Sequence, residues 1–351
     1  MALADPTTPI SLITPVVALA EVTDRQLALY ADLIYRRTGI RVSPQKKTLL
    51  SNRLRRRLRE TGIAGFEEYY EYLRGLPPDH AEWDGFLQEI TTHETYLFRD
   101  ESQWKWFQNS YLPQRAAAAR QGLRLTALRI WSAACSTGDE AFTAACCVAA
   151  CLPNHAEWQI RILGTDIGAG AVAQAQTGRF SERAMRQVPA SYRTRFFVKD
   201  PATAQWQARP VLTAMTAFRQ HNLLEPLGER AFDIVFLKNV LIYFAPESKR
   251  RVMENVRSAV QPGGMLVTGP AEGVADLLRD FVRLQPWLYQ RPKEPRRLDT
   301  PARCPAPIPE DIPTTVHGDC PDFRDEVCEN GTVPLGGKGT GTLFVPKRPE
   351  K

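Results

Sequence analysis

Residues 129–143 constrain the fold more than any other stretch of the sequence. They read RIWSAACSTGDEAFT: a short apolar run, a turn of small residues, and the start of a helix that we expect to continue to Cys151. Such a unit is typical of a parallel α/β sheet, in which ligands bind at the carboxyl end of the strand. Asp139 and Glu140 at the turn favour a ligand with an amine or hydroxyls, because phosphate sites are built from backbone N–H groups and Lys.

Further apolar runs follow at regular intervals and are separated by segments with helical patterning. Together they predict βαβ units and a mostly parallel sheet, with strands at 128–134, 159–165, 232–237 and 265–268. Asp166 follows the second strand, where a carboxylate binds ribose hydroxyls in nucleotide-binding α/β folds. The remaining strands are expected in a small antiparallel insertion at about 195–220 (segments 195–199, 210–213 and 217–220) and in a closing hairpin (280–284 and 287–290).

Residues 21–95 have the apolar periodicity of an all-helical domain. The expected helices cover 24–36, capped by Asp24, then 44–60, 66–73 and 80–91. The remaining boundaries are a linker and connecting helix over 96–127 and the α/β domain over 128–291. Residues 1–20 and the segment 292–351, which contains eleven Pro, are predicted to be disordered.

The basic residues are concentrated in one segment. The chain has a net charge of +6, and residues 36–59 contain ten basic residues and no acidic one. A helix that begins at Pro44 places its arginines opposite or beside its leucine stripe: Arg53, Arg55, Arg56, Arg57 and Arg59. A solvated face is the ordinary explanation for such a run, but the absence of acidic residues favours an acidic docking partner.

The composition excludes several classes of protein. Hydrophobic content of 43% and charged content of 24% are typical of a globular protein, and no apolar run approaches the roughly 20 residues that span a bilayer. The N-terminus has no basic leader and is interrupted by Pro6, Pro9 and Pro15, so we do not interpret it as a signal peptide. The cysteines show no metal-ligand spacing, so we expect no metal site, and buried reduced thiols indicate a cytoplasmic protein.

The first turn also restricts the kind of ligand. It has neither the GxGxxG of dinucleotide-binding folds nor the GK[ST] of phosphate-binding loops. Together with Asp166, the turn therefore predicts a nucleoside ligand that carries no phosphate. S-adenosylmethionine fits this description, because it combines a cationic amine and a sulfonium with a ribose.

Four blocks of the sequence together resemble the CheR family, the S-adenosylmethionine-dependent methyltransferases of bacterial chemoreceptors. They are HETYLFRD at 93–100, WSAACSTGDE at 131–140, GTDI at 164–167 and NVLIYF at 239–244. Their order and spacing also resemble those of the family, over roughly residues 21–291. The resemblance implies a Rossmann-like class I methyltransferase sheet with a small antiparallel insertion, preceded by an all-helical domain.

The resemblance also implies roles for individual residues. Arg99 would lie near the cofactor's carboxylate and the reacting centre, and Tyr243 would lie beside the methyl group. Glu140 would bind the amino-acid end of the cofactor, and Asp166 the ribose. Further implied cofactor contacts are Thr95 and His93 in the linker, Asn222 and Leu223 beside the adenine, and Lys238 and Asn239 after the fourth strand.

The implied reaction transfers methyl to glutamates in the cytoplasmic helical region of methyl-accepting chemotaxis receptors, giving γ-methyl esters and S-adenosylhomocysteine. A glutamate is already anionic at neutral pH, so no general base is needed and the catalytic residues, Arg99 and Tyr243, would position the reactants. The acidic receptor helix would dock on the arginine helix. Family members that also bind the receptor's carboxyl-terminal tether peptide usually have Gly in a loop of the insertion. Residues 199–210 contain none, so we expect weak or no tether binding.

The sequence departs from the family pattern at His93, Lys238 and Pro270, where Asn, Arg and His are usual. These departures leave a second class open, a non-catalytic S-adenosylmethionine-binding signalling module. A nucleic-acid methyltransferase ranks last. Enzymes that act on exocyclic base amines carry Asn/Asp-Pro-Pro-Tyr/Phe after the fourth strand, where this chain has NVLI, and no aromatic residues alternate with the arginines. We therefore expect no nucleic-acid partner and no membrane insertion.

Overall fold

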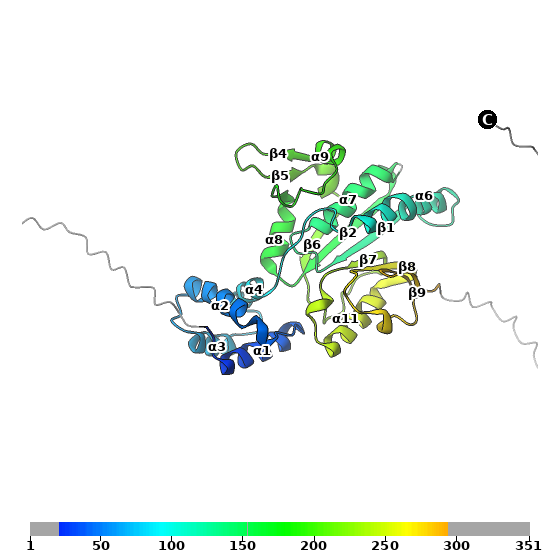
Figure 1. The fold of residues 1–351 in the computed structure, drawn as a ribbon. Coiled ribbons are helices and arrows are strands. Elements are labelled where there is room, and N and C mark those ends of the chain that lie inside the picture. The colour runs from blue at the N-terminus through cyan, green and yellow to red at the C-terminus, as the bar shows by residue number, and fades with distance from the viewer. Residues whose placement is uncertain (1–20, 153, 294–351) are drawn as a thin grey trace, which may run out of the picture. The chain divides into compact units, whose positions relative to one another are not determined.

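Helices with one apolar face make up the N-terminal part of the computed structural model, which describes residues 21–152 and 154–293 (Figure 1). They are α1 (Asp24–Thr38), α2 (Lys47–Thr61), α3 (Phe66–Gly75) and α4 (Ala81–Ile90). The disorder expected for residues 1–20 and for the Pro-rich segment beyond residue 293 lies outside the described residues.

The ends of α1 and α2 show why these helices begin and stop where they do. Thr23, not the expected Asp24, is the N-cap of α1, because its hydroxyl accepts the Gln26 N–H at 3.2 Å and completes a capping box. Both helices end at a glycine with a left-handed backbone, Gly39 and Gly62 (φ 72° each). The helix expected from Pro44 begins as a 3₁₀ turn, η1 (Pro44–Lys46), before α2.

The apolar faces of these helices form a core of their own. Leu50, Leu54 and Leu58 of α2 are buried in it, as the leucine stripe predicts. Tyr30 packs against Tyr69 and donates its hydroxyl to a backbone carbonyl at 2.7 Å. This core fixes which face of α2 points outward, and hence where its arginines lie.

A linker and a connecting helix follow. The connecting helix is made of α5 (Glu101–Trp106), the π-helical η2 (Phe107–Tyr111) and α6 (Leu112–Arg120). Its aromatic side chains pack on the sheet, since Trp104 stacks on Phe236 with ring centroids 5.0 Å apart. The linker is thereby held over the sheet rather than free of it.

The central sheet has seven strands in the order β6-β2-β1-β7-β8-β10-β9. Strands β6, β2, β1, β7 and β8 pair with their neighbours in parallel, which confirms the mostly parallel sheet. Strand β10 pairs antiparallel with β8 and with β9, and its pairing with β9 confirms the closing hairpin. Their bounds are β1 (Ala127–Ala133), β2 (Gln159–Asp166), β6 (Thr216–Gln220), β7 (Phe232–Leu237), β8 (Val260–Thr268), β9 (Val282–Gln285) and β10 (Leu288–Gln290).

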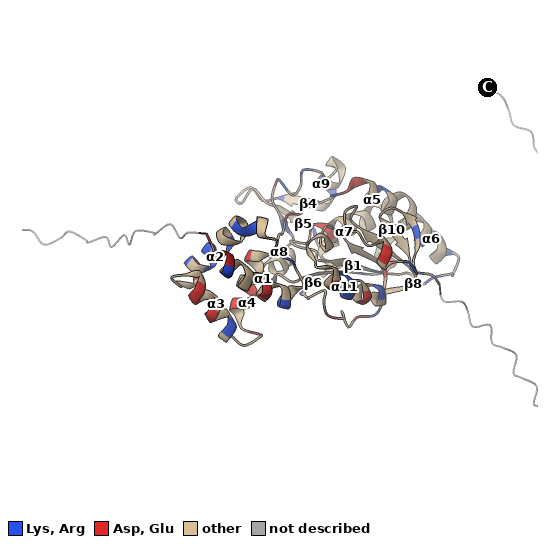
Figure 2. Ribbon diagram, turned by 60° about the horizontal axis from the view of Figure 1, so that its bottom comes forward, with Lys and Arg blue, Asp and Glu red and all other residues tan. Residues whose placement is uncertain are grey.

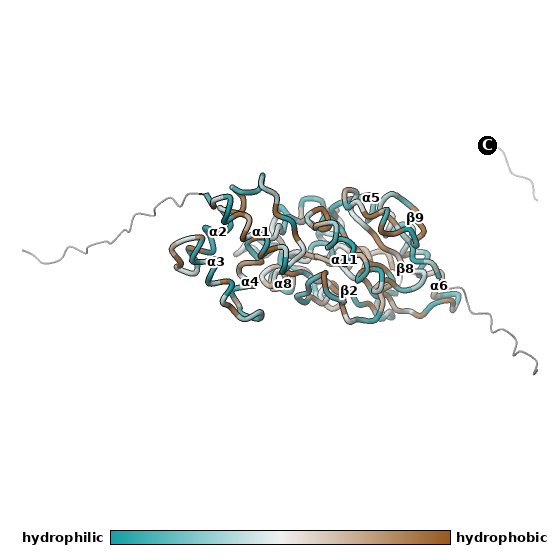
Figure 3. The backbone as a smooth tube through the Cα atoms, turned by 90° about the horizontal axis from the view of Figure 1, so that it is seen from below, coloured by the Kyte–Doolittle hydropathy of each residue, from teal (hydrophilic) through white to brown (hydrophobic). Residues whose placement is uncertain are grey.

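Successive side chains of the strands point into two different cores, as period-2 geometry requires. Ile130 and Phe236 belong to the core shared with α7, whereas Trp131 and Val235 belong to the core shared with α11. Hydrophobic and hydrophilic stretches alternate along the helices (Figure 3). The helices and 3₁₀ turns of this part are α7 (Asp139–Cys151), η3 (His155–Glu157), α8 (Ala169–Thr177), η4 (Leu241–Tyr243), α11 (Pro246–Ala259) and η5 (Ala275–Leu277).

The insertion differs from the expectation in two of its three segments. Its sheet has the strand order β3 (Arg179–Phe180), β5 (Trp206–Ala208) and β4 (Phe197–Lys199), and the helix α9 (Ala190–Phe196) lies between β3 and β4 in the chain. The strand predicted at 210–213 is wrong, because Pro210 starts the short helix α10 (Pro210–Thr213). The strand at 217–220 is β6, which joins the main sheet in parallel beside β2 instead of the antiparallel insertion.

The helical part touches the α/β part through backbone and side-chain hydrogen bonds. Ile40 and Phe244 form an isolated antiparallel bridge. On α4, Gln88 accepts the Ala171 N–H of α8 at 3.0 Å, and Asp84 accepts a hydrogen bond from Gln220 at 2.7 Å. These contacts lie beside the carboxyl ends of the parallel strands, where the candidate site is found.

Candidate active site

The strand order creates a switch point between β1 and β7. From β1 the sheet continues through β2 to β6 on one side, and through β7 to β8 on the other. Crevices at such points are the usual ligand sites of α/β sheets. A pocket opens here, and every residue predicted to contact the cofactor or the methyl group lines it: His93, Thr95, Arg99, Glu140, Asp166, Asn222, Leu223, Lys238, Asn239 and Tyr243.

The turn after β1 uses left-handed backbone conformations at Ala134 (φ 58°), Ser136 (φ 51°) and Gly138 (φ 90°). A Cβ on Gly138 would lie 2.9 Å from the Cβ of Ala175 on α8. The small residues therefore serve packing as well as ligand access. The turn brings the Ser136 N–H within 2.8 Å of Asp166 and starts α7 with Asp139 and Glu140.

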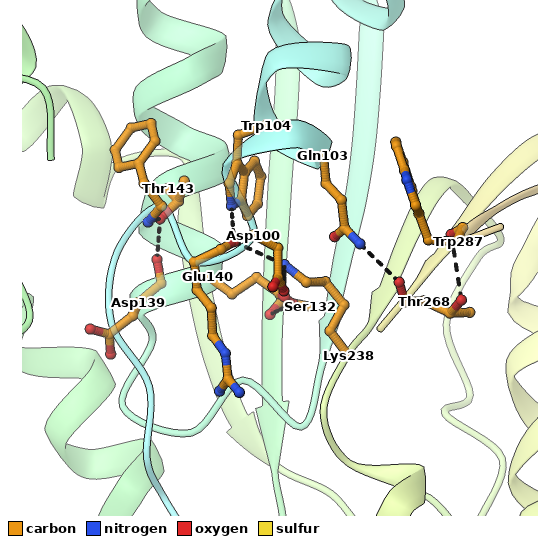
Figure 4. Close-up of polar contacts among 12 residues, drawn as sticks. Asp100, Gln103, Trp104, Ser132, Asp139, Glu140, Thr143, Lys238, Thr268 and Trp287 are labelled. Atoms are coloured by element: carbon orange, nitrogen blue, oxygen red, sulfur yellow. Dashed lines mark hydrogen bonds and ion pairs between the residues drawn. The ribbon is translucent and has the colours of Figure 1, made fainter. Parts of the chain in front are cut away.

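Glu140 belongs to a buried cluster of charges (Figure 4). Its carboxylate accepts the Ser132 hydroxyl at 2.7 Å and lies 3.6 Å from the Lys238 ammonium. The same ammonium lies 3.2 Å from Asp100, the residue that follows Arg99 in the linker. Two carboxylates thus share one ammonium, which leaves one negative charge within this cluster and favours a cationic ligand group beside Glu140.

Of the two acids at the turn, Glu140 lines the pocket and Asp139 does not. Burial raises the pKa of both carboxyls, for Asp139 to about 6. Asp139 accepts the Thr137 hydroxyl at 2.6 Å, and its backbone carbonyl accepts the Thr143 hydroxyl at 2.7 Å. Asp139 therefore stabilises the first turn of α7, while Glu140 is the acid available to a ligand.

Asp166 lies at the end of β2 and is 6% exposed. One carboxylate oxygen accepts the Ser136 N–H at 2.8 Å and the other accepts the Gly168 N–H at 2.9 Å. A carboxylate offers about four lone-pair positions, so each oxygen keeps one for a further donor. The two backbone bonds fix the carboxylate in the orientation needed for a pair of neighbouring hydroxyls.

The linker crosses over Asp166. His93 lies with its Nδ1 4.0 Å from the Asp166 carboxylate, and its Nε2 is 2.7 Å from the Thr91 hydroxyl. Burial lowers the pKa of His93, although Asp166 acts in the opposite direction. Arg99 donates to the Glu94 carbonyl at 3.1 Å, and Thr95 lines the same wall. His93 therefore lies beside Asp166, and Arg99 lies further along the linker.

Asn222 and Leu223 follow β6, where adenine contacts were expected. The Asn222 side chain donates to the Arg37 carbonyl of α1 at 2.9 Å and accepts the Leu224 N–H at 3.1 Å. It thus ties the pocket to the helical part, and Leu223 is the residue of the pair with an apolar side chain in the pocket wall. His221, which the sequence interpretation overlooked, also lines the pocket and packs against Trp131.

The helical part forms one wall of the pocket, which the sequence interpretation did not anticipate. Tyr243 accepts the Arg41 N–H through its backbone carbonyl at 2.9 Å, and its ring lies 5.3 Å from the Lys46 ammonium. The other lining residues between α1 and α2 or on α2 include Thr38, Ile40, Val42, Leu49 and Arg53. The sequence signal for this wall was the alternation of apolar residues at Ile40 and Val42 between two helices.

The arginines of α2 divide into two groups. Arg53 and Arg57 are turned inward. Arg53 lines the pocket and donates to the Thr92 hydroxyl at 3.0 Å, and Arg57 pairs with Glu82 at 2.7 Å. Arg56 pairs with Glu89 at 2.9 Å while its side chain stays 50% exposed, and Arg55 and Arg59 are on the outer part of the helix. Figure 2 shows acidic residues interspersed with the basic ones on these helices.

The pocket fits S-adenosylmethionine. Glu140 is placed for a cationic amine, Asp166 for ribose hydroxyls and Leu223 for a flat apolar ring. The turn after β1 contributes carboxylates and not a Lys, so the donor set does not match a phosphate group.

Within residues 21–152 and 154–293, no group of three or more His, Cys, Asp and Glu side chains is arranged to hold a metal ion. Among the same residues, no helix has the length and hydropathy needed to cross a membrane.

The chain matches two family profiles, "CheR methyltransferase, all-alpha domain" over residues 25–91 and "CheR methyltransferase, SAM binding domain" over residues 93–286. A probable chemotaxis protein methyltransferase of Rhizobium etli is 30% identical over 69% of this chain and 90% of the relative. Chemotaxis protein methyltransferase 2 of Pseudomonas aeruginosa is 33% identical over 68% of this chain and 83% of the relative. A chemotaxis protein methyltransferase of Klebsiella aerogenes is 30% identical over 78% of this chain and 91% of the relative.

Proposed function

Because the chain belongs to the CheR family of S-adenosylmethionine-dependent methyltransferases, we propose that it methylates glutamate side chains in the cytoplasmic helical region of methyl-accepting chemotaxis receptors. The products are glutamate γ-methyl esters and S-adenosylhomocysteine. The observation that supports this most is the convergence of Asp166, Glu140, Arg99 and Tyr243 on one pocket that is also lined by the basic helix α2.

In the proposed mechanism, the cofactor supplies a methyl group on a sulfonium, which a carboxylate oxygen can attack directly. Asp166 would accept hydrogen bonds from the ribose hydroxyls, using the lone pairs that its hydrogen bonds to two backbone N–H groups leave free. Glu140, held by Ser132 and Lys238, would accept a hydrogen bond from the cofactor's amine. Arg99 pairs with the cofactor's carboxylate, and Thr95 and Asn239 complete the wall. The residues act by orientation and water exclusion, so none of them has to remove a proton.

The receptor glutamate would enter beside Tyr243. The Lys46 ammonium lies 5.3 Å from the Tyr243 ring, and Leu49 and Ile242 expose apolar surface nearby (43% and 45%). A cation beside the entrance attracts the substrate carboxylate before it is desolvated. Arg55, Arg56 and Arg59 extend the positive surface along α2 for the acidic receptor helix.

The cofactor roles are tested by calorimetric titration with S-adenosylhomocysteine on the wild type, Asp166→Asn and the exposed control Asp276→Asn. Loss of the charged acceptor should weaken binding about 10- to 100-fold in Asp166→Asn, because a hydrogen bond to a charged group contributes about 1.5–3 kcal/mol. The control should bind like the wild type. Equal affinity of Asp166→Asn and wild type would contradict the assignment of the ribose site.

The reaction is tested with receptor membranes and cofactor labelled in the methyl group. The proposal expects label in the receptor that is released by mild base, because carboxylic esters are hydrolysed under conditions in which methylamines are stable. Cofactor binding without any such transfer would favour a non-catalytic binding module instead.

A further inference from the structure

Glu272 is a buried carboxylate that the proposed mechanism does not use. It follows β8 in the short sequence GPAE and is only 1% exposed. One carboxylate oxygen accepts the Val240 N–H at 3.1 Å. Burial raises the pKa of Glu272, and the hydrogen bond from the Val240 N–H opposes that rise. The carboxylate therefore contacts the backbone of one short segment through Val240.

That segment is the loop between β7 and α11 that carries two pocket residues. Asn239 has a left-handed backbone (φ 57°), which costs energy for a residue other than glycine unless its surroundings hold it. Tyr243 ends the 3₁₀ helix η4, and both residues line the pocket. The charge-assisted hydrogen bond that Glu272 accepts from Val240, the residue after Asn239, helps to hold this conformation.

The backbone around Glu272 leaves room for this contact. Gly269 lies so close that a Cβ there would be 2.9 Å from the Glu272 carboxylate and 3.1 Å from the Asn239 nitrogen. The backbone carbonyl of Glu272 separately accepts a hydrogen bond from the Lys249 ammonium at 3.2 Å, which anchors the residue from α11. Glu272 is thus fixed on one side and in contact with the loop on the other.

We propose that Glu272 is a positioning residue for methyl transfer, whose carboxylate holds the loop 239–243 and thereby places Asn239 and Tyr243 in the pocket. The assignment of a role to Tyr243 in transfer rests on the function proposed above. The contact by which Glu272 holds the loop does not rest on that function, because it is present in the protein without substrate.

The first test is hydrogen–deuterium exchange of the peptide that covers residues 239–244, measured on the protein without cofactor. Glu272→Ala and Glu272→Gln should both accelerate exchange of this peptide, by about tenfold or more in Glu272→Ala, because the acceptor of the Val240 N–H is lost. Glu272→Gln keeps one carbonyl oxygen and should have the smaller effect. Glu247→Ala is the matched control, since Glu247 is 66% exposed at the start of α11 and pairs with Arg250.

The second test measures S-adenosylhomocysteine affinity and methyl transfer to receptor at a temperature at which all variants are folded. Glu272→Ala should weaken cofactor binding and reduce kcat by about 10- to 100-fold, with partial recovery in Glu272→Gln. In a Tyr243→Phe background the further loss of kcat should be smaller, because Glu272 acts partly through Tyr243.

Unchanged exchange of peptide 239–244 in Glu272→Ala would overturn the proposal. Faster exchange with wild-type cofactor affinity and wild-type transfer would overturn it as well, because the loop would then be loosened without consequence. If the wild type transfers no methyl, the proposed function fails by itself, and the exchange and affinity measurements still decide the role of Glu272.

Discussion

At the scale of single residues, the buried Lys238 shows how a change from the usual family residue is accommodated. Its ammonium lies 3.2 Å from Asp100 and 3.6 Å from Glu140, and it donates to the Arg99 carbonyl at 3.3 Å. An ammonium has three donors that can point in different directions, so a Lys can contact all three acceptors. Lys238 therefore connects the linker to the first turn of α7.

His93 is the second such change, and it predicts a dependence of stability on pH. Burial lowers the pKa of His93 below its ordinary value of 6.5; the charged groups that act on it are Asp166, Arg53 and Glu89. Above pH 6.5 the imidazole is neutral in the folded and unfolded protein. Below it, the unfolded chain binds the proton more readily, so the free energy of unfolding decreases as the pH falls. Replacing His93 by Asn should therefore reduce the loss of unfolding free energy between pH 7.5 and 5.5.

Urea denaturation of wild type and His93→Asn at both pH values measures this difference. His155→Asn, on η3, is a suitable control because His155 does not line the pocket and is partly exposed. An identical loss of stability in wild type and His93→Asn would show that His93 does not contribute.

At the scale of elements, α2 combines a structural role with the docking role proposed for it, on different faces. Arg57 has only 12% of its side chain exposed and pairs with Glu82, of which 9% is exposed. Glu82 also accepts the Tyr69 hydroxyl. Removing one partner of such a pair leaves the other buried without compensation. The outer arginines lack this burial and can be removed at little cost to folding.

We therefore expect Arg57→Ala to lower the free energy of unfolding by about 3 kcal/mol. The double variant Arg56→Ala/Arg59→Ala should unfold like the wild type but raise the KM for receptor by about 3- to 10-fold at low salt, with less effect at high salt. Urea denaturation and receptor methylation at two salt concentrations measure these effects. Cofactor affinity serves as the control, since neither outer arginine lines the pocket. A receptor KM that is unchanged in the double variant would contradict docking on α2.

The insertion shows which elements could be predicted from the sequence and which could not. The long buried strands, such as β1 and β7, have continuous apolar runs that identify them. The segments predicted for the insertion are only a few residues long. At that length the apolar pattern does not distinguish the helix α10 from the strand β6. Pairing decided the outcome, since β6 is a strand of the main sheet only because β2 offers it an edge.

At the scale of the whole molecule, the pocket depends on the contact between the helical part and the α/β part. Asn222 donates to Arg37, and Gln220 donates to Asp84. Arg53 of α2 contacts Thr92, one residue before His93. Helix α2 is thereby connected to the linker that passes Asp166, so the proposed receptor-docking helix and the proposed cofactor site share one wall.

The insertion also bears on how the molecule would engage a receptor. Its strands β4 and β5 are joined by a loop without Gly, in which Asp200 accepts the Ala202 N–H at 2.9 Å. We expect this loop to bind a receptor's carboxyl-terminal tether peptide weakly or not at all. Calorimetry should show the same affinity, within about twofold, for receptor fragments with and without the tether. A clear gain with the tether would contradict this expectation.

The sequence by itself determined the fold class, the succession of its main strands along the chain and, through the motifs that resemble the family, the candidate cofactor contacts that the structure brings to one pocket. These follow from apolar periodicity and from short motifs at strand ends, which are local properties of the chain. Only the tertiary structure decided that Asn222 ties the pocket to α1, that Arg53 and Arg57 turn inward, that the helical part forms a pocket wall, and that Glu272 holds the loop after β7. Each of these depends on partners distant in the sequence, whose proximity arises only when the helices and the sheet pack together.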